Sequence, residues 1–519
     1  MAVRLVRLVL LLLVAGIYVW LAAGRPATGR LRALAASLLV LAAASYPNFG
    51  LGHPQRGTPP APAHIHYWDT FHYFMGAKYL PELAYGGLYE ATLTAGRELG
   101  AFDYVTHLRD LATYGLRAAG GVNAAAVRGR FTPERWEAFK RDLLFFGPRI
   151  NEWRGLLQDH GYNDPPPRAW LLHAVVRDLP ATPRTVTLVT SIDYVLVLLA
   201  FTAAWWGFGG LAAMLAFATL WLSPLARFDF IGGALLRWDW LAALVMGASA
   251  LARGWGATAG ALLGYAVLAR VFPALLLLPL LARWLRGRRA GEIGGPAGRC
   301  LATALLVLVL AGALLAALGE GSLAPEYRTK LRLHGEGAFI NSVGLGAMIA
   351  AYSAPWSLGA DGRVFVAHAA LIAARPPGWV LALAVVVYAA LAWPLALRAR
   401  PAESLVYGVP LLFLGLSLSG YYYSFLILLM LLPWHAGRAE PLALVAMGLL
   451  AALFAAAYAV EAVSPEMLTF FAAVSLQLAL YFVLWLGLEY VRARARAARP
   501  AADVSAHDTV GPETRLPRL

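Results

Sequence analysis

The sequence is poor in cysteine, lysine and charged residues. One cysteine, Cys300, occurs in 519 residues, which excludes an intramolecular disulfide. Charged residues make up 14% of the chain and hydrophobic residues 60%, whereas soluble domains have roughly a quarter and half. Lysine is also far rarer than arginine. We therefore expect most of the chain to lie in lipid, and its use of Arg, Ala and Leu is typical of a high-GC bacterial genome.

The sequence also lacks the motifs of nucleotide chemistry. It has no Walker loop, no Rossmann glycine pattern and no G-x-S-x-G elbow in a suitable context, so a nucleotide-dependent reaction is not expected. The formal charge of +14 comes from arginines at the ends of apolar runs. Such flanking charge is typical of membrane topology rather than of a nucleic-acid surface, and we expect no nucleic-acid partner.

Short basic segments predict the topology. Residues 286–299, 398–400, 435–438 and 492–499 are basic and separate apolar runs, so we expect them in the cytoplasm. The stretch 255–285 is too long for one ordinary span and carries Arg270. We interpret it as two short helices that meet at Arg270, because a charge in mid-membrane is costly unless it faces a cavity.

The resulting prediction is an all-α polytopic protein with about 11–13 transmembrane helices and a large first extracytoplasmic loop that contains amphipathic helices. We expect it in the bacterial inner membrane, with its active site facing the periplasm or cell exterior. The predicted parts are N-terminal transmembrane helices (1–46), an extracytoplasmic catalytic loop (47–184), a transmembrane core with a split hairpin near Arg270 (185–318), a second extracytoplasmic loop (319–376), C-terminal transmembrane helices (377–491) and a cytoplasmic basic tail (492–519).

The loop 47–184 contains the densest polar and aromatic block, residues 64–79. If a helix begins near Asp69, then His72 and Tyr73 lie on its face three and four residues later. The alternative is that Asp69 only caps a helix and that the aromatic residues form an interfacial belt.

Further blocks follow, and the predicted topology brings all of them to the same side of the membrane. This convergence favours a shared site over separate structural roles. They are residues 161–170 with a proline run, residues 227–229, residues 237–239, residues 268–273 and residues 417–424.

A metal site is an open alternative. His64, His66, Asp69 and His72 are four possible ligands within nine positions. No second cluster supplies further ligands, and histidine is common at interfaces. We therefore expect no metal and no diffusible cofactor.

In their order along the chain, these blocks resemble the motifs of the C-type (GT-C) membrane glycosyltransferases, in particular the bacterial polyprenyl-phosphate-mannose mannosyltransferases of glycosyltransferase family 87. The similar elements are Asp69 in the first loop, Gly86-Gly87-Leu88-Tyr89, Tyr162 to Pro167, Gly260 to Gly264 followed by Arg270 to Pro273, and Ser419 to Ser424 before Pro433. The chain differs from the family in having Arg at 270 where Lys is usual, in an extra Asn-Asp beside the prolines, and in an insert over residues 100–155. The insert carries Arg109, Arg117, Arg128, Arg130, Arg135 and Arg141 among aromatics, which is typical of amphipathic helices that cover the active site or lie on lipid.

The resemblance implies transfer of a sugar, mannose or another hexose or pentose, from a polyprenyl-phosphate donor to a lipid or surface-glycan acceptor. It implies that Asp69 is the general base of an inverting reaction. The donor phosphate would be held by cations, with Arg270 first and Lys78, Arg227 and Arg237 as further candidates. The acceptor cleft would be formed by His66, His72, Tyr73, Tyr162, Asn163, Asp164, Arg168 and Tyr422.

Two other classes remain open. A secondary transporter or lipid flippase for a glycolipid or anionic solute would use buried Asp and Arg residues as a pathway. We find no convincing internal repeat, and most charges lie at the outer ends of spans, which disfavours this class. The third class is a non-catalytic assembly subunit, in which Asp69 would be replaceable.

Overall fold

Long apolar helices make up most of the structure, a computed structural model that describes residues 2–53, 63–289, 294–319, 323–337, 339–358, 364–463 and 466–498. Six helices in these ranges are long and apolar enough to cross a membrane. The chain is therefore an α-helical multi-pass membrane protein, as predicted. The six helices are α1 (Ala2–Ala22), α10 (Pro183–Phe208), α16 (Pro296–Ala317), α20 (Gly378–Arg398), α24 (Pro441–Val463) and α25 (Met467–Ala497).

Shorter helices complete the bundle, and several of them are broken. The break predicted at Arg270 is confirmed, because α14 ends at Ala269 and α15 begins at Ala274. The predicted spans 404–419 and 421–435 are present as two shorter apolar helical runs, 401–415 and 420–431, which are separated by β6 (Leu418–Ser419). The bundle also contains α2 (Gly29–Ser45), α11 (Gly210–Leu222), α12 (Phe228–Ile231), α13 (Asp239–Ala252), α14 (Gly256–Ala269), α15 (Ala274–Arg289), α21 (Pro401–Ser404), η5 (Leu405–Gly408), α22 (Val409–Gly415), η6 (Gly420–Leu426) and α23 (Ile427–Leu431).

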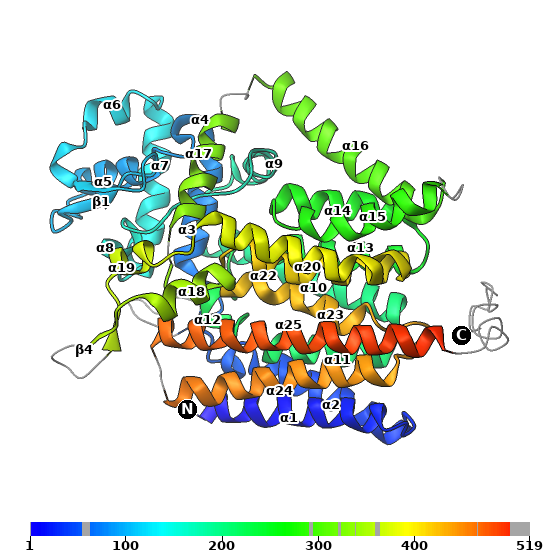
Figure 1. Ribbon diagram of the computed structural model, residues 1–519. Helices are drawn as coiled ribbons and strands as arrows, with labels where there is room; N and C mark the ends of the chain where they lie inside the picture. The colour runs from blue at the N-terminus through cyan, green and yellow to red at the C-terminus, as the bar shows by residue number, and fades with distance from the viewer. Residues whose placement is uncertain are drawn as a thin grey trace.

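The basic segments meet at one end of the bundle, where Figure 1 shows the C-terminal end of α25. Arg283 Nε donates to the carbonyl of Ala399 at 2.6 Å. Arg492 is buried and contacts Glu403 at 2.7 Å. The ion pair of Arg492 with Glu403 stabilises α25 beyond the predicted boundary at residue 491. The last residues of the predicted tail, 499–519, lie outside the described residues.

The opposite end of the bundle carries the segments predicted to be extracytoplasmic. There β3 (Ser342–Val343) pairs antiparallel with β6 (Leu418–Ser419), which ties residues 319–376 to the turn at 420–424. Near them lie α17 (Leu323–Glu336), α18 (Leu345–Ser353) and α19 (His368–Ala373), and the hairpin of β4 (Ser357–Leu358) with β5 (Val364–Phe365).

Three glycines at intervals of four form the contact between α14 and α16. A Cβ on Gly260 would lie 2.2 Å from the carbonyl oxygen of Cys300, and one on Gly256 would lie 2.3 Å from that of Pro296. At Gly264 the nearest atom would be 3.1 Å away, on Val307. Such small-residue spacing lets two membrane helices approach closely. The glycines of this predicted motif therefore have a packing role.

The first loop forms a separate lobe beside the bundle, with a hydrophobic core of its own. Its core includes Phe71, Phe74, Phe139 and Phe146, all fully buried. Figure 1 shows α5, α6 and α7 farthest from the bundle, with α3 and α9 between them and the spans. Residues 54–62 of this loop lie outside the described residues. The elements are η1 (Asn48–Gly50), α3 (Tyr67–Lys78), α4 (Leu80–Leu83), α5 (Leu88–Glu98), β1 (His107–Arg109), β2 (Leu116–Ala118), η2 (Ala119–Gly121), α6 (Ala124–Arg128), α7 (Pro133–Phe146), η3 (Gly147–Arg149), α8 (Trp153–Leu156) and α9 (Pro166–Val176).

The insert at 100–155 differs from the prediction in part. Its first half is a two-stranded hairpin of β1 and β2 rather than an amphipathic helix. Four of its arginines pair with glutamates of α4 and α5, because those helices present carboxylates on the same side. The pairs join Arg117 and Arg130 to Glu90, Arg128 to Glu98, and Arg135 to Glu82. These ion pairs hold the insert against helices α4 and α5 of the lobe.

Candidate active site

Helix α3 directs Asp69 and Tyr73 toward the bundle. The helix begins at Tyr67, two residues before Asp69, with His66 as its N-cap, and Nδ1 of His66 accepts the backbone N–H of Asp69 at 3.2 Å. Asp69 is therefore not the capping residue. Gly76 lies on the same face, and a Cβ there would come within 2.6 Å of the Tyr162 ring. The face of α3 predicted from the spacing thus packs against the loop before α9.

Arg237 is the partner of Asp69. Its Nε lies 2.9 Å from Asp69 Oδ2, and the two side chains are 6% and 16% exposed. Its Nη1 donates to the hydroxyl of Tyr73, and its Nη2 donates to that of Tyr421 at 3.0 Å. The predicted base is therefore held by one of the predicted phosphate ligands.

The backbone of Arg237 is fixed by a carboxylate from the membrane bundle. Oδ2 of Asp193, on α10, accepts the N–H of Arg237 at 2.7 Å and that of Trp238 at 3.3 Å. This contact anchors the turn before α13.

Asp164 joins the other two arginines. Its Oδ1 accepts from Arg270 Nη1 at 2.6 Å, and its Oδ2 accepts from Arg168 Nη1. Arg168 Nε also donates to Asp239 Oδ2 at 2.8 Å, and the Tyr265 hydroxyl donates to the same oxygen at 2.8 Å. All of these charges are buried. Buried charges persist in proteins only when they are paired or when they bind a ligand.

The three arginines surround the ring of Tyr73. The guanidinium carbons of Arg237, Arg168 and Arg270 lie 4.6, 5.8 and 5.8 Å from its centroid. The Tyr73 hydroxyl accepts from Arg237 and donates to Asn163 Oδ1 at 3.1 Å. Three arginines and three carboxylates meet in this cluster, so it offers cations that can bind an oxyanion and a carboxylate that can accept a proton beside it. We call Asp69, Tyr73, Asp164, Arg168, Arg237, Asp239 and Arg270 the arginine cluster.

Other predicted residues lie next to this cluster. The Tyr162 ring packs edge-on against Tyr73 at 5.5 Å, and Tyr422 has its ring 5.9 Å from Arg270. His66 contributes through the backbone of Asp69. His72 points elsewhere, and its Nε2 lies 2.9 Å from the Tyr89 hydroxyl. Burial lowers the pKa of His72, so the neutral imidazole is favoured there.

Two predicted phosphate ligands have other partners among the described residues. Lys78 pairs with Asp142 at 2.6 Å and donates to the carbonyl of Leu179 at 2.7 Å. Arg227 pairs with Glu461 on α24. Both cations are held by lobe or bundle carboxylates, and neither belongs to the arginine cluster.

The possible metal ligands do not converge. Within the described ranges, no three His, Cys, Asp or Glu side chains form a group that could hold a metal ion. His66 is directed to the Asp69 backbone and His72 to Tyr89.

Sequence reasoning missed Asp239, Tyr421, Tyr265 and Asp193 as parts of the site. Asp239 and Tyr421 nevertheless belong to the polar blocks 237–239 and 417–424, which the sequence does indicate. Nothing in the sequence indicates that Asp193 or Tyr265, within apolar helices, reaches the same place.

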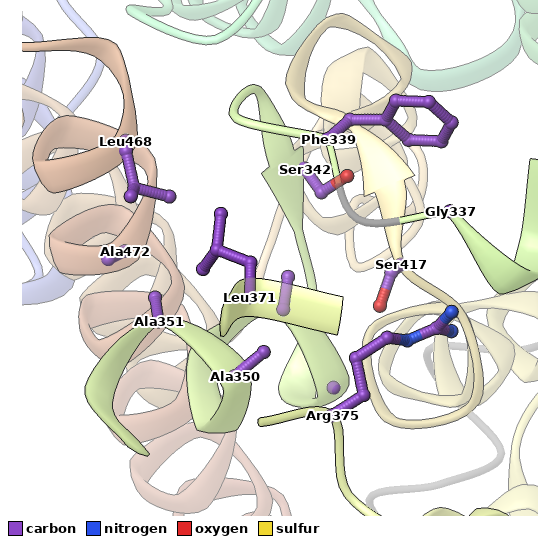
Figure 2. Close-up of a pocket in the computed structure, with 12 residues that line it drawn as sticks. Gly337, Phe339, Ser342, Ala350, Ala351, Leu371, Arg375, Ser417, Leu468 and Ala472 are labelled. Carbon is purple, nitrogen blue, oxygen red and sulfur yellow. The ribbon is translucent and has the colours of Figure 1, made fainter. Parts of the chain in front are cut away.

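A separate pocket lies between α18, α25 and the strand pair β3–β6. Figure 2 shows Ser342, Ser417 and Arg375 around it. Its volume is about 20 Å³, which holds about one water molecule. It is therefore too small for a sugar or a phosphate group.

A comparison of the chain with protein-family models, curated proteins and solved structures finds no match.

Proposed function

We propose that this protein transfers a sugar from a polyprenyl-phosphate donor to a hydroxyl of a lipid or surface glycan. The observation that carries the proposal is the ion pair of Asp69 with Arg237, next to Arg270 and Arg168. The carboxylate supplies a base, and the guanidinium groups supply donors for a phosphate. The proposed fold is a GT-C-like bundle, in which the short helices add to the six long ones to give about 11–13 spans.

In the proposed reaction, the donor phosphate binds Arg270 and Arg237. Asp69 Oδ2 then takes the proton of the acceptor hydroxyl, whose oxygen attacks the anomeric carbon from the face opposite the phosphate. The bond from the anomeric carbon to the phosphate oxygen breaks, and its electron pair stays on the leaving polyprenyl phosphate. The configuration inverts. Negative charge grows on the phosphate as this bond breaks, so fixed cations favour the transition state.

The position of the cluster supports a lipid-linked donor. Arg270 lies at the break between α14 and α15, two short apolar helices of the bundle, while Asp164 and Asp69 come from the lobe. A ligand with an apolar tail and an anionic head would contact both parts. No diffusible cofactor is needed, because the donor carries the activated bond. In this proposal the site faces the periplasm or cell exterior of a bacterial inner membrane.

The experiment is a transfer assay with the purified full chain in lipid nanodiscs. Radiolabelled polyprenyl-phosphate mannose is incubated with lipid extract of the host membrane, and new labelled glycolipid is separated from donor. The proposal expects a labelled product with release of polyprenyl phosphate. If wild type moves the donor across a bilayer without transferring sugar, the flippase alternative holds instead.

A further inference from the structure

A second, larger cavity lies between the lobe and helix α17. It is an open cleft of about 630 Å³ between the turn after α4, the loop that follows β1, and helix α17. Figure 1 shows α17 beside α4. This volume is in the range of small-molecule sites. The charged residues of its wall are Glu82, Glu90, Asp110, Arg130, Glu326 and Lys330.

The carboxylates of the cleft already have partners. Glu82 pairs with Arg135, and Glu90 pairs with Arg117 and Arg130. Asp110 accepts the backbone N–H of Ala112 at 2.8 Å, and Glu326 accepts that of Tyr85 at 3.4 Å. Glu82 and Glu90 are therefore neutralised by arginines, whereas Asp110 and Glu326 keep their negative charge.

Lys330 is different, because it has no carboxylate partner. It is one of three lysines in the chain, and the other two, Lys78 and Lys140, have carboxylates within 4 Å. Lys330 is 2% exposed and lies within 4 Å of no carboxylate in the described part of the chain. Its Nζ donates to the carbonyl of Tyr85 at 3.3 Å and lies 5.7 Å from the Tyr114 ring centroid. An ammonium has three donors, so this environment leaves it under-satisfied.

The cleft is connected to the arginine cluster through one residue. Tyr85, whose backbone is held by Glu326 and Lys330, stacks on Tyr162 at 6.1 Å. Its hydroxyl donates to the carbonyl of Asp164 at 2.7 Å. A ligand in the cleft would therefore contact the wall that supports the arginine cluster.

We propose that this cleft binds the polar part of the acceptor, and that the part it binds is an anionic saccharide whose carboxylate or phosphate pairs with Lys330. Naming the ligand as the acceptor rests on the proposed function, whereas the binding of an anionic saccharide in the cleft does not. The hydroxyl groups of a sugar can donate hydrogen bonds to the carboxylate oxygens of the cleft. They can also approach the backbone of Gly86, because a Cβ at this position would have no atom within 4 Å. The polar wall disfavours a prenyl chain.

Binding of an anion at Lys330 should depend on pH, because it is linked to protonation of the lysine. Burial lowers the pKa of Lys330 to about 7, and an anion bound to Lys330 favours its charged form and raises that pKa. Binding near pH 7 or above should therefore take up a proton, and the affinity should fall as the pH rises through 7. Several titratable and charged groups surround Lys330. On its own helix they are Glu326 and His334, and before α9 and on α3 they are Asp159, His160 and His72. From the facing loops they are Tyr85, Arg109, Asp110, Tyr114 and Arg130.

The test is calorimetric binding to the full chain in detergent micelles. The probes are cellobiouronic acid and its neutral counterpart cellobiose, with glucose 6-phosphate and glucose as a second pair that separates phosphate from carboxylate. At least one anionic probe should bind about tenfold or more tightly than its neutral counterpart. Lys330→Met should remove this preference, and Lys140→Met, on α7, should keep it. Lys330→Met should fold, because an apolar isostere of a buried unpaired charge is often neutral or stabilising.

The pH arm uses the uronic acid, which stays ionised throughout. Wild type should bind it about tenfold more weakly at about pH 8.5 than at about pH 6 and take up a proton, whereas Lys330→Arg should bind with little change over this range. Equal binding of neutral and charged probes, no saturable binding of either anionic probe, or an unchanged preference in Lys330→Met overturns the inference. If the probes bind but wild type transfers no sugar, the cleft stands and the proposed function fails. If transfer occurs without probe binding, the reverse holds.

Discussion

Nε of Arg237 lies 2.9 Å from Oδ2 of Asp69, although the two residues come from different parts of the chain, the turn before α13 and the first turns of α3. The proposed base and a proposed phosphate ligand therefore form an ion pair with each other. A donor phosphate that takes up Arg237 would free Asp69 to accept a proton. The donor is thus expected to bind before the acceptor reacts.

Asp69→Asn tests this relationship. Asparagine preserves the size of the side chain but cannot act as a base, so we expect transfer to fall about 10²- to 10⁴-fold. Arg237 loses its counter-ion, so donor affinity should be equal or higher than in wild type. Transfer rate and donor dissociation constant are measured in nanodiscs. An Asp69→Asn protein with full transfer activity would refute the proposed mechanism.

Arg270→Ala should weaken donor binding by tenfold or more, a free energy of about 1.4 kcal/mol. The reason is that Arg270 is the cluster arginine at the helix break, where the head group of a lipid donor would enter. Arg270→Lys should keep part of the affinity, since the charge remains but the planar guanidinium is lost. The donor affinity of each purified variant is measured by titration with donor and compared with that of wild type. Unchanged affinity in Arg270→Ala would remove this residue from the donor site.

The α14–α16 contact predicts a difference between two Gly→Ala substitutions. Gly260→Ala would place a methyl group 2.2 Å from the carbonyl oxygen of Cys300, while a Cβ at Gly312 meets nothing within 4 Å. Overpacking costs about 1–3 kcal/mol, so Gly260→Ala should lower the thermal midpoint. Gly312→Ala on α16 is the matched control and should not. Equal midpoints would mean that α14 and α16 do not pack as described.

Arg492 predicts a stability effect at the opposite end of the bundle. It is buried against Glu403, Glu440 and Glu489. Arg492→Ala leaves the buried Glu489 without a cation, while Glu403 and Glu440 keep Arg400 and Arg496. Removing one partner of a buried ion pair typically costs about 3–5 kcal/mol. Exposed Arg494 on the same helix is the control, and Arg494→Ala should unfold like wild type. If both variants unfold at the same urea concentration, the network does not stabilise the fold.

The orientation is tested by labelling on a Cys300→Ser background. Thr113, in the exposed turn of the lobe, and Arg494, at the other end of the bundle, each receive a cysteine in separate variants. A membrane-impermeant maleimide added to intact spheroplasts should modify the cysteine at 113 and spare the one at 494. The reverse pattern would invert the predicted topology.

The sequence predicted the parts of the fold that depend on hydrophobicity and charge. Apolar runs located the long helices, and a charge in an apolar stretch located the break at Arg270. The two spans predicted at 404–435 are present but shorter, over 401–415 and 420–431, because composition does not reveal the short strand β6 that separates them. The hairpin at 107–118 failed because its short strands carry no periodicity long enough to be distinguished from a helix.

The candidate site was predictable in part for a similar reason. Asp69, Tyr73, Asp164, Arg168, Arg237 and Arg270 stand out as polar residues near apolar ends, and the structure brings them together. Which charge pairs with which could not be predicted, because Lys78 and Arg227 look equivalent in sequence. Their pairing with Asp142 and Glu461 depends on tertiary contacts between distant segments.

The glycine contact also bears on how this protein responds to its bilayer. α16 packs on α14 through the glycines of α14, but only 11% of its most apolar 18 residues are buried, so most of its length lies exposed on the outside of the bundle. Helices in this situation adjust their tilt to the thickness of the hydrocarbon layer. The chain continues from α16 into α17, which forms a wall of the cleft. We therefore expect membrane thickness to affect the width of this cleft.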